Sequence, residues 1–170
     1  MRFNNINCGD KSEFTRRCIG EAILRMMKTT EFAKLKVSEI AKMAGVSRTT
    51  FYNYYNTPYQ VLADYLNIIV SEYIANSEKS GNTKYFEYSH IVYSLHFFDQ
   101  YAEYFLTLSK QKLHSIMFEG INAFMMEHVR PESGITIYRM YSYAGALLNI
   151  FLKWEEGGKK ERVEDVANTL

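Results

Sequence analysis

The chain has 170 residues, of which 47% are hydrophobic, 23% are charged and 15% are aromatic, with only two prolines. This is the composition of a globular chain long enough to bury a core, and it excludes a low-complexity or fibrous protein. No apolar run reaches the roughly 18 residues that a membrane span needs, and no signal-peptide pattern is present. Cys8 and Cys18 form no metal-binding spacing. We therefore expect a cytoplasmic, reduced protein without metal or other cofactor.

Charge is distributed unevenly along the chain although the net charge is only +1. Residues 1–60 hold ten Lys or Arg and five Asp or Glu, whereas residues 61–170 hold ten basic and fourteen acidic residues. A basic N-terminal part on a mildly acidic body indicates a polyanionic partner for the N-terminal part. The alternative is a random scatter of solvated charges.

The first third of the chain carries helical patterns with clear boundaries. Residues 1–10 are expected to be a disordered leader, and apolar residues at helical spacing then predict a helix from Lys11 to Met27. A short apolar face over 37–44 predicts a second helix, which Gly45 ends. Ser47 is expected to cap a third helix that runs to about residue 55. Thr57 and Pro58 then predict the start of a long helix to about residue 78.

The remaining two thirds of the chain are also helical in pattern. Residues 77–83 form a polar linker, after which two or three helices are expected between 84 and 129. The sequence RPESG at 130–134 breaks the pattern, and helices over about 135–155 and 162–169 follow. No β-alternation persists anywhere. The fold class is therefore predicted to be all-α, with about nine helices in total.

Two short helices joined by a three-residue turn with a glycine are typical of a helix-turn-helix. Phe51 and Tyr55 lie four residues apart and are expected to face the core. The N-terminal end of the third helix would then lie in the major groove of DNA, where Arg48 can bond a guanine and Thr49 can contact thymine. Tyrosine hydroxyls commonly contact phosphates. The alternative is a helical hairpin with surface tyrosines.

The sequence VSEIAKMAGVSRTTFYNYYNTPYQVL resembles the N-terminal domain of the TetR family of transcriptional regulators, and the resemblance covers about residues 11–66. It implies a three-helix DNA-binding domain over residues 1–57 and a helical ligand-binding and dimerisation domain over 58–170. It implies base contacts by Ser38, Arg48, Thr49 and Asn53 and phosphate contacts by Thr50, Tyr52 and Tyr54. With two flanking polar residues, the DNA-binding candidates are Lys36, Ser38, Ser47, Arg48, Thr49, Thr50, Tyr52, Asn53 and Tyr54.

Two positions depart from the family pattern. Lys36 stands where the family usually has a threonine N-cap, and Pro58 stands where it usually has a lysine that contacts a phosphate. The loss of that lysine predicts a shallower salt dependence of DNA binding. These departures leave an alternative function open, in which a helical binding protein acts through a protein partner with weak or no DNA reading of its own.

The aromatic-rich segment YFEYSHIVYSLHFFDQYAEYFLTL, residues 85–108, is the candidate lining of a pocket for a small apolar or aromatic ligand. Tyrosine hydroxyls and two histidines would fix the orientation of that ligand. The alternative is that these aromatic side chains form an ordinary packed core. The pocket candidates, which include three residues beyond this segment, are Tyr93, His96, Phe97, Tyr101, His114, Phe118 and Tyr141.

The last long helix carries small and apolar residues that are expected to form a homodimer interface. A two-fold symmetric DNA reader needs such a dimer, and the family uses its last helices in this way. The alternative is that the short helix at 162–169 covers the patch within one chain. The interface candidates are Gly145, Ala146, Leu147, Ile150, Phe151 and Trp154.

Sequence motifs of common enzyme classes are missing, including GxSxG, GxxxxGK[ST] and HExxH. The sequence therefore predicts a protein that is not an enzyme. The expected function is sequence-specific DNA binding by a transcriptional regulator, a ligand-responsive repressor that acts as a homodimer on a palindromic operator. An activator is the alternative within the same class, because the sign of regulation depends on where the operator lies.

Overall fold

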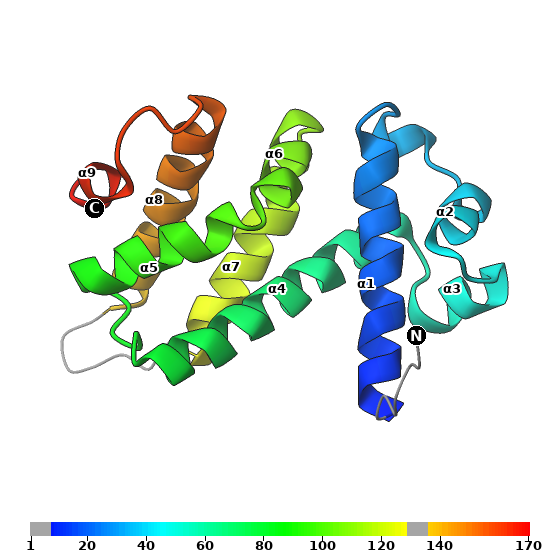
Figure 1. Ribbon diagram of the computed structural model, residues 1–170, viewed down its shortest axis with the longest axis horizontal. Coiled ribbons are helices and arrows are strands. Elements are labelled where there is room, and N and C mark those ends of the chain that lie inside the picture. The colour runs from blue at the N-terminus through cyan, green and yellow to red at the C-terminus, as the bar shows by residue number, and fades with distance from the viewer. Residues whose placement is uncertain (1–7, 129–135) are drawn as a thin grey trace, which may run out of the picture. The chain divides into compact units, whose positions relative to one another are not determined.

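The computed structural model describes residues 8–128 and 136–170, and every regular element in these ranges is helical (Figure 1). The expectation of an all-α fold with about nine helices is confirmed for the described residues. The α-helices and one 3-10 helix are α1 Cys8–Met27, η1 Phe32–Lys34, α2 Val37–Ala44, α3 Arg48–Tyr54, α4 Pro58–Ser80, α5 Tyr88–Asp99, α6 Ala102–Lys110, α7 His114–His128, α8 Ile137–Glu156 and α9 Val163–Ala167.

Most predicted helix boundaries agree with the structure to within about three residues. Helix α1 begins at Cys8 rather than Lys11, so the expected leader is shorter at its C-terminal end, and its residues 1–7 lie outside the described residues. Three helices, α5 to α7, occupy the segment for which two or three were expected. The expected break at 130–134 also lies outside the described residues.

The chain separates into two compact units between Ile68 and Ile69, inside α4. The first turns of α4 belong to the N-terminal unit because Val61 and Leu62 are fully buried there. The sequence predicted a domain boundary between residues 57 and 58, which is where α4 begins. The division between the two compact units lies further along the same helix. Each unit is described separately below.

The N-terminal unit packs α1 against α2, and α2 against α3. Its core is formed by side chains that are fully buried, namely Ile19, Ile23, Ile40, Phe51 and Leu62. Helix α2 shows why it needs this packing: its N-cap, Lys36, makes no side-chain capping bond. Burial of Ile40 and Ala41 against neighbouring helices therefore stabilises a helix that its own N-terminus does not.

The C-terminal unit is a bundle in which α7 packs with α8, α6 packs with both, and α5 packs with α9 and α8. Its core is rich in aromatic side chains, and the largest fully buried ones are Tyr104 and Phe105. Thr136 caps α8 by accepting a hydrogen bond from the Arg139 backbone N–H at 3.3 Å. In the part of the chain that the structure describes, no helix is long and apolar enough to cross a lipid bilayer.

Candidate functional site

The turn between α2 and α3 has the geometry that its sequence predicts. Gly45 adopts φ +71°, a left-handed conformation that glycine reaches without strain. The backbone N–H of Val46 donates to the carbonyl of Ala41 at 2.9 Å, which completes the C-terminal cap of α2. Ser47 Oγ then accepts from the Thr50 backbone N–H at 2.9 Å and caps α3. These bonds fix the angle at which α3 leaves the turn.

Helix α3 separates buried from exposed aromatic side chains. Phe51 is fully buried and Tyr55 nearly so, whereas Tyr52 and Tyr54 are 46% and 39% exposed. The rings of Phe51 and Tyr55 meet edge to face at 5.9 Å. The predicted division of the four aromatics into core and surface is therefore confirmed. Among the other candidate contacts, Thr50 is half-buried. The remaining ones are exposed, namely Lys36, Ser38, Ser47, Arg48, Thr49 and Asn53.

Three of the nine candidates, namely Ser47, Thr50 and Lys36, make polar contacts within the chain. The hydroxyls of Ser47 and Thr50 lie 2.9 Å apart and bond to each other, so their first role is to build the start of α3. Lys36 Nζ lies 4.0 Å from a Glu39 carboxylate oxygen, both side chains being largely solvated. A surface pair of this kind is weak and leaves the ammonium group available to a phosphate.

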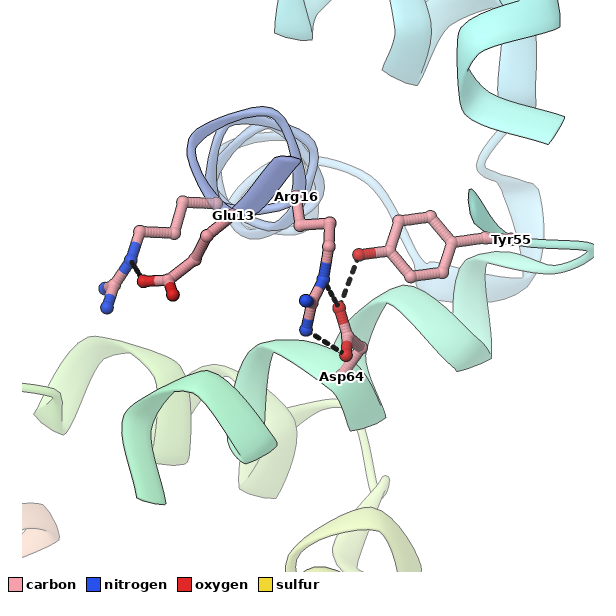
Figure 2. Close-up of polar contacts among 5 residues, drawn as sticks. Glu13, Arg16, Tyr55 and Asp64 are labelled. Carbon is pink, nitrogen blue, oxygen red and sulfur yellow. Dashed lines mark hydrogen bonds and ion pairs between the residues drawn. The ribbon is translucent and has the colours of Figure 1, made fainter. Parts of the chain in front are cut away.

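A carboxylate on α4 joins three elements of the N-terminal unit, as Figure 2 shows. Asp64 Oδ2 accepts from the Tyr55 hydroxyl at 2.5 Å and from Arg16 Nε at 2.7 Å, while Oδ1 accepts from Arg16 Nη2 at 2.6 Å. Tyr55 is the C-cap residue of α3, and Arg16 lies on α1. One carboxylate therefore ties the end of α3 to both α1 and α4.

The electrostatics of this cluster agree with its geometry. The hydrogen bond to Asp64 raises the pKa of Arg16 above its ordinary value, and burial opposes that shift. Burial, followed by the bond to Asp64, raises the pKa of Tyr55. The guanidinium therefore stays charged and the phenol stays protonated, so that both remain donors to the carboxylate.

The sequence pattern predicted that Tyr55 faces the core, but it did not single out Asp64. A signal was nevertheless present, because Asp64 is the one charged residue in the segment PYQVLADYLNIIVS, residues 58–71. A lone acid in an otherwise uncharged stretch of helix indicates a specific partner. The partners themselves, 48 and 9 residues away, become visible only in the fold.

A cavity of about 30 Å³ lies in the C-terminal unit and is lined by side chains of α4 to α8 and of Tyr85. Its lining carries no charged side chain, and its hydroxyl-bearing members are Tyr73, Tyr85 and Tyr143. The Tyr143 hydroxyl is buried and has no hydrogen-bond partner among the described residues. The cavity exceeds the space that one water needs but is far smaller than one that holds a benzene ring, about 150 Å³.

A buried histidine fixes one wall of this cavity. His90 Nδ1 lies 2.6 Å from the Asn82 carbonyl oxygen, which can only accept, so Nδ1 carries the proton. His90 Nε2 then accepts from the Tyr73 hydroxyl at 2.5 Å, and Ser94 Oγ lies 2.8 Å from the same hydroxyl. Burial lowers the pKa of His90 and raises that of Tyr73, so both groups are neutral.

The predicted pocket residues do not form this cavity: none of the seven lines it. His96, His114 and Tyr141 are exposed, Phe97 is buried in the aromatic core, and three are half-buried, namely Tyr93, Tyr101 and Phe118. The predicted residues and the lining residues differ in helical phase. On α5 Phe98 lines the cavity and Phe97 does not, and on α8 Tyr143 lines it and Tyr141 does not. A step of one or two residues turns the helix face by about 100° or 200°.

The predicted interface residues also divide into two groups. Phe151 and Trp154 are buried within the chain, and Leu147 lines the cavity together with Phe151. Trp154 Nε1 donates to the Glu161 carbonyl at 3.0 Å, which holds the ring inside. Gly145, Ala146 and Ile150 are half-buried. The outward face of α8 carries Tyr138, which is 81% exposed, together with the exposed Tyr141 and Asn149. Of the predicted residues, Gly145 borders this face, since a β-carbon there would meet no neighbouring atom.

A charged cluster links the end of α5 to the end of α8. Lys159 Nζ lies 2.5 Å from Asp99 Oδ1 and 3.9 Å from Glu155 Oε2, and Glu155 is buried. Burial, followed by the neighbouring Asp99 carboxyl, raises the pKa of Glu155 to about 7, with Lys159 opposing the shift. Within the described ranges, no three acidic, histidine or cysteine side chains lie close enough to hold a metal ion.

Comparisons with known proteins give a structural relative and no relative by sequence. No protein-family model and no curated protein match the chain. A solved structure with a similar fold is the transcriptional regulator FadR from Bacillus subtilis, determined in complex with stearoyl-CoA. The TM-score is 0.58 at 16% sequence identity, and the match covers 90% of this chain and 94% of that chain. The chain therefore shares the all-helical fold of that protein.

Proposed function

We propose that this chain is a DNA-binding transcriptional regulator of the TetR family, a ligand-responsive repressor that acts as a cytoplasmic homodimer on a palindromic operator. The proposal rests on the way in which α3 is capped, anchored and exposed. Ser47 caps the helix and Phe51 anchors it in the core, so that Arg48, Thr49 and Asn53 project from its exposed side. An exposed, capped and anchored second helix is what a helix-turn-helix places in the major groove.

The roles of the individual side chains follow from their chemistry and from the family resemblance. Arg48 would bond a guanine through two parallel N–H groups, and Thr49 would contact a thymine methyl. Base contacts by Ser38 and Asn53 and phosphate contacts by Lys36, Thr50, Tyr52 and Tyr54 complete the interface, with Ser47 shaping its edge. Two such helices in a dimer would enter successive major grooves, about 34 Å apart.

The body, residues 58–170, would bind the ligand and form the dimer. The fold neighbour supports a ligand-responsive regulator, since FadR is a transcriptional regulator whose structure was determined with stearoyl-CoA bound. The outward face of α8, with Tyr138 and Tyr141 exposed, supports an interface between two copies. In a symmetric dimer, this face would meet its own counterpart.

The chemistry of the cavity lining supports one class of ligand. Its lining lacks a charged side chain that could pair with an ionised group, so the ligand buried there would be apolar and uncharged. At about 30 Å³ the cavity is too small for such a ligand, so side chains such as Phe98 and Phe124 must move to make room for it. A ligand would act through its higher affinity for one of two states, by ~1–3 kcal/mol of coupling.

A matched pair of probes tests the ligand class. Thermal unfolding of the protein would be recorded with 1-decanol and with decanoate, which have the same chain length and differ in the charge of the head group. We expect the alcohol to raise the unfolding temperature and the carboxylate to have no comparable effect. A larger stabilisation by decanoate would contradict an uncharged ligand.

A second candidate function is a helical binding protein that acts through a protein partner. Two observations favour it. Lys36 provides no side-chain cap for α2, and Pro58 stands where the family usually has a lysine. In this case the exposed tyrosines of α3 would contact a protein rather than phosphates.

Selection of bound duplexes from a random DNA pool separates the two functions. The purified full-length protein is used, and the bound DNA is sequenced. We expect an enriched palindrome whose half-sites lie about one helical turn apart. Weak, salt-sensitive binding without an enriched sequence would overturn the proposed function and leave the protein-partner function.

A further inference from the structure

The Asp64 cluster does more than hold the N-terminal unit together. A buried ion pair adds little net stability over well-packed apolar side chains, because removing two charges from water costs free energy. Asp64 and Arg16 are both substantially buried, with 22% and 31% of their side chains exposed. The contact of Gly20 with the Tyr65 ring already packs α1 against α4 one turn along. The polar cluster therefore contributes orientation, since hydrogen bonds are directional and apolar packing is not.

The Tyr55 hydroxyl is the part of this cluster that acts on α3. The Tyr55 ring packs on Phe51 without it, and its backbone N–H donates to the Phe51 carbonyl at 3.0 Å. The hydroxyl reaches Asp64 at 2.5 Å (Figure 2). Helix α3 is thus held at its first turn by the Ser47 cap and at its C-cap residue, Tyr55, by a bond to α4.

We infer that Asp64 is a positioning residue for DNA recognition, which sets the orientation of α3 through the Tyr55 hydroxyl while Arg16 holds the carboxylate in place. The inference rests on the proposed function, in which α3 reads base edges. Groups that read a partner work only when a surrounding layer of hydrogen bonds holds them within about 0.5 Å of the productive geometry. Asp64 itself does not contact DNA; it affects DNA binding by orienting α3.

A neighbouring ion pair supplies a matched control. Arg17 Nε donates to Glu13 Oε1 at 3.0 Å, and this pair lies within α1, with the Glu13 side chain 52% exposed. The variants Asp64→Asn and Glu13→Gln each remove one negative charge beside an arginine of the N-terminal unit. Loss of a negative charge by itself favours binding to DNA. The two variants therefore share the charge effect and differ in their contact with α3.

Affinity for the selected palindrome tests the inference. Glu13→Gln is expected to bind as tightly as the wild-type protein or more tightly. Asp64→Asn is expected to bind about three- to ten-fold more weakly, the effect of losing one hydrogen bond of ordinary net strength. Equal affinities of the two variants would overturn the positioning role.

The variant Tyr55→Phe separates positioning from stability, because it keeps the ring and removes only the hydroxyl. Binding would be measured well below the unfolding temperature on duplexes whose half-site spacing differs by one base pair. We expect weaker binding and a smaller penalty for the wrong spacing than in the wild-type protein. A lowered unfolding temperature with unchanged spacing discrimination would show a structural role only and overturn the inference.

Different results would contradict the proposed function and the positioning role of Asp64. If the wild-type protein selects no DNA sequence, the proposed function and this inference fail together. If the wild-type protein selects a palindrome and Asp64→Asn matches Glu13→Gln, the positioning role fails and the proposed function stands.

Discussion

Gly20 on α1 and Tyr65 on α4 lie so close together that a β-carbon added at position 20 would overlap the tyrosine ring. Glycine weakens a helix interior by about 1 kcal/mol relative to alanine. The close crossing offsets that cost, because it lets Tyr65 bury all but 8% of its surface. It also brings α1 near enough for Arg16 to reach Asp64.

The variant Gly20→Ala is therefore expected to destabilise the protein although alanine is the better helix former. Overpacking costs about 1–3 kcal/mol, and the gain in helix propensity offsets about 1 kcal/mol of it. Urea unfolding measures the difference. Gly145→Ala is the control, since a β-carbon there would meet no neighbouring atom. A stabilised Gly20→Ala variant would show that α1 and α4 are not in close contact.

Two tyrosines on the cavity wall are expected to respond in opposite ways to loss of the hydroxyl. Tyr73→Phe leaves the buried His90 Nε2 without its donor and should lower the free energy of unfolding by about 1–3 kcal/mol. Tyr143→Phe removes a buried hydroxyl that has no partner among the described residues, so the change should be neutral or stabilising. Chemical unfolding of both variants checks this, and equal losses would contradict the hydrogen-bond network.

The buried Glu155 predicts a pH dependence of stability. Its pKa is about 7 in the folded chain and 4.5 ordinarily, so between these values the folded state binds more protons than the unfolded state. Stability attributable to Glu155 is therefore full below about pH 4.5 and is lost as the pH rises to 7, by about 1–3 kcal/mol. The difference in unfolding free energy between the wild-type protein and Glu155→Gln isolates this contribution from that of His90. A difference that does not change between pH 5 and 7 would contradict it.

Two equally exposed tyrosines test the proposed dimer. Tyr141 on α8 and Tyr88 on α5 are each 46% exposed. If the outward face of α8 joins two copies, Tyr141→Arg places two charges near the symmetry axis and weakens dimerisation at least ten-fold, or about 1.4 kcal/mol. Tyr88→Arg should leave the dimer intact. Sedimentation equilibrium measures both, and dimers of equal strength would place the interface elsewhere.

Local signals made the N-terminal half predictable from sequence. Gly45, Ser47 and Thr57 each act within four residues of themselves, as a left-handed turn residue and as two helix caps. The spacing of Phe51 and Tyr55 likewise determines which side of one short helix is buried. Such features need no knowledge of the rest of the fold.

The cavity and the Asp64 cluster depend on contacts between distant segments, and sequence reasoning missed both. In the aromatic-rich body nearly every helix face carries apolar residues, so periodicity does not identify the face that turns inward. This is why Phe97 and Tyr141 were predicted where Phe98 and Tyr143 line the cavity. The choice of His96 and His114 over the buried His90 has the same origin.

Methylation interference at guanine N7 tests the central claim, that α3 reads base edges in the major groove, most directly. The selected palindrome would be methylated and then bound by the wild-type protein and by Arg48→Ala, a variant expected to lose about 1–3 kcal/mol of binding free energy. The account predicts that N7 methylation of one guanine in each half-site blocks the wild-type protein and no longer affects the variant. Binding that is insensitive to methylation at every guanine, or an identical pattern for both proteins, would contradict it.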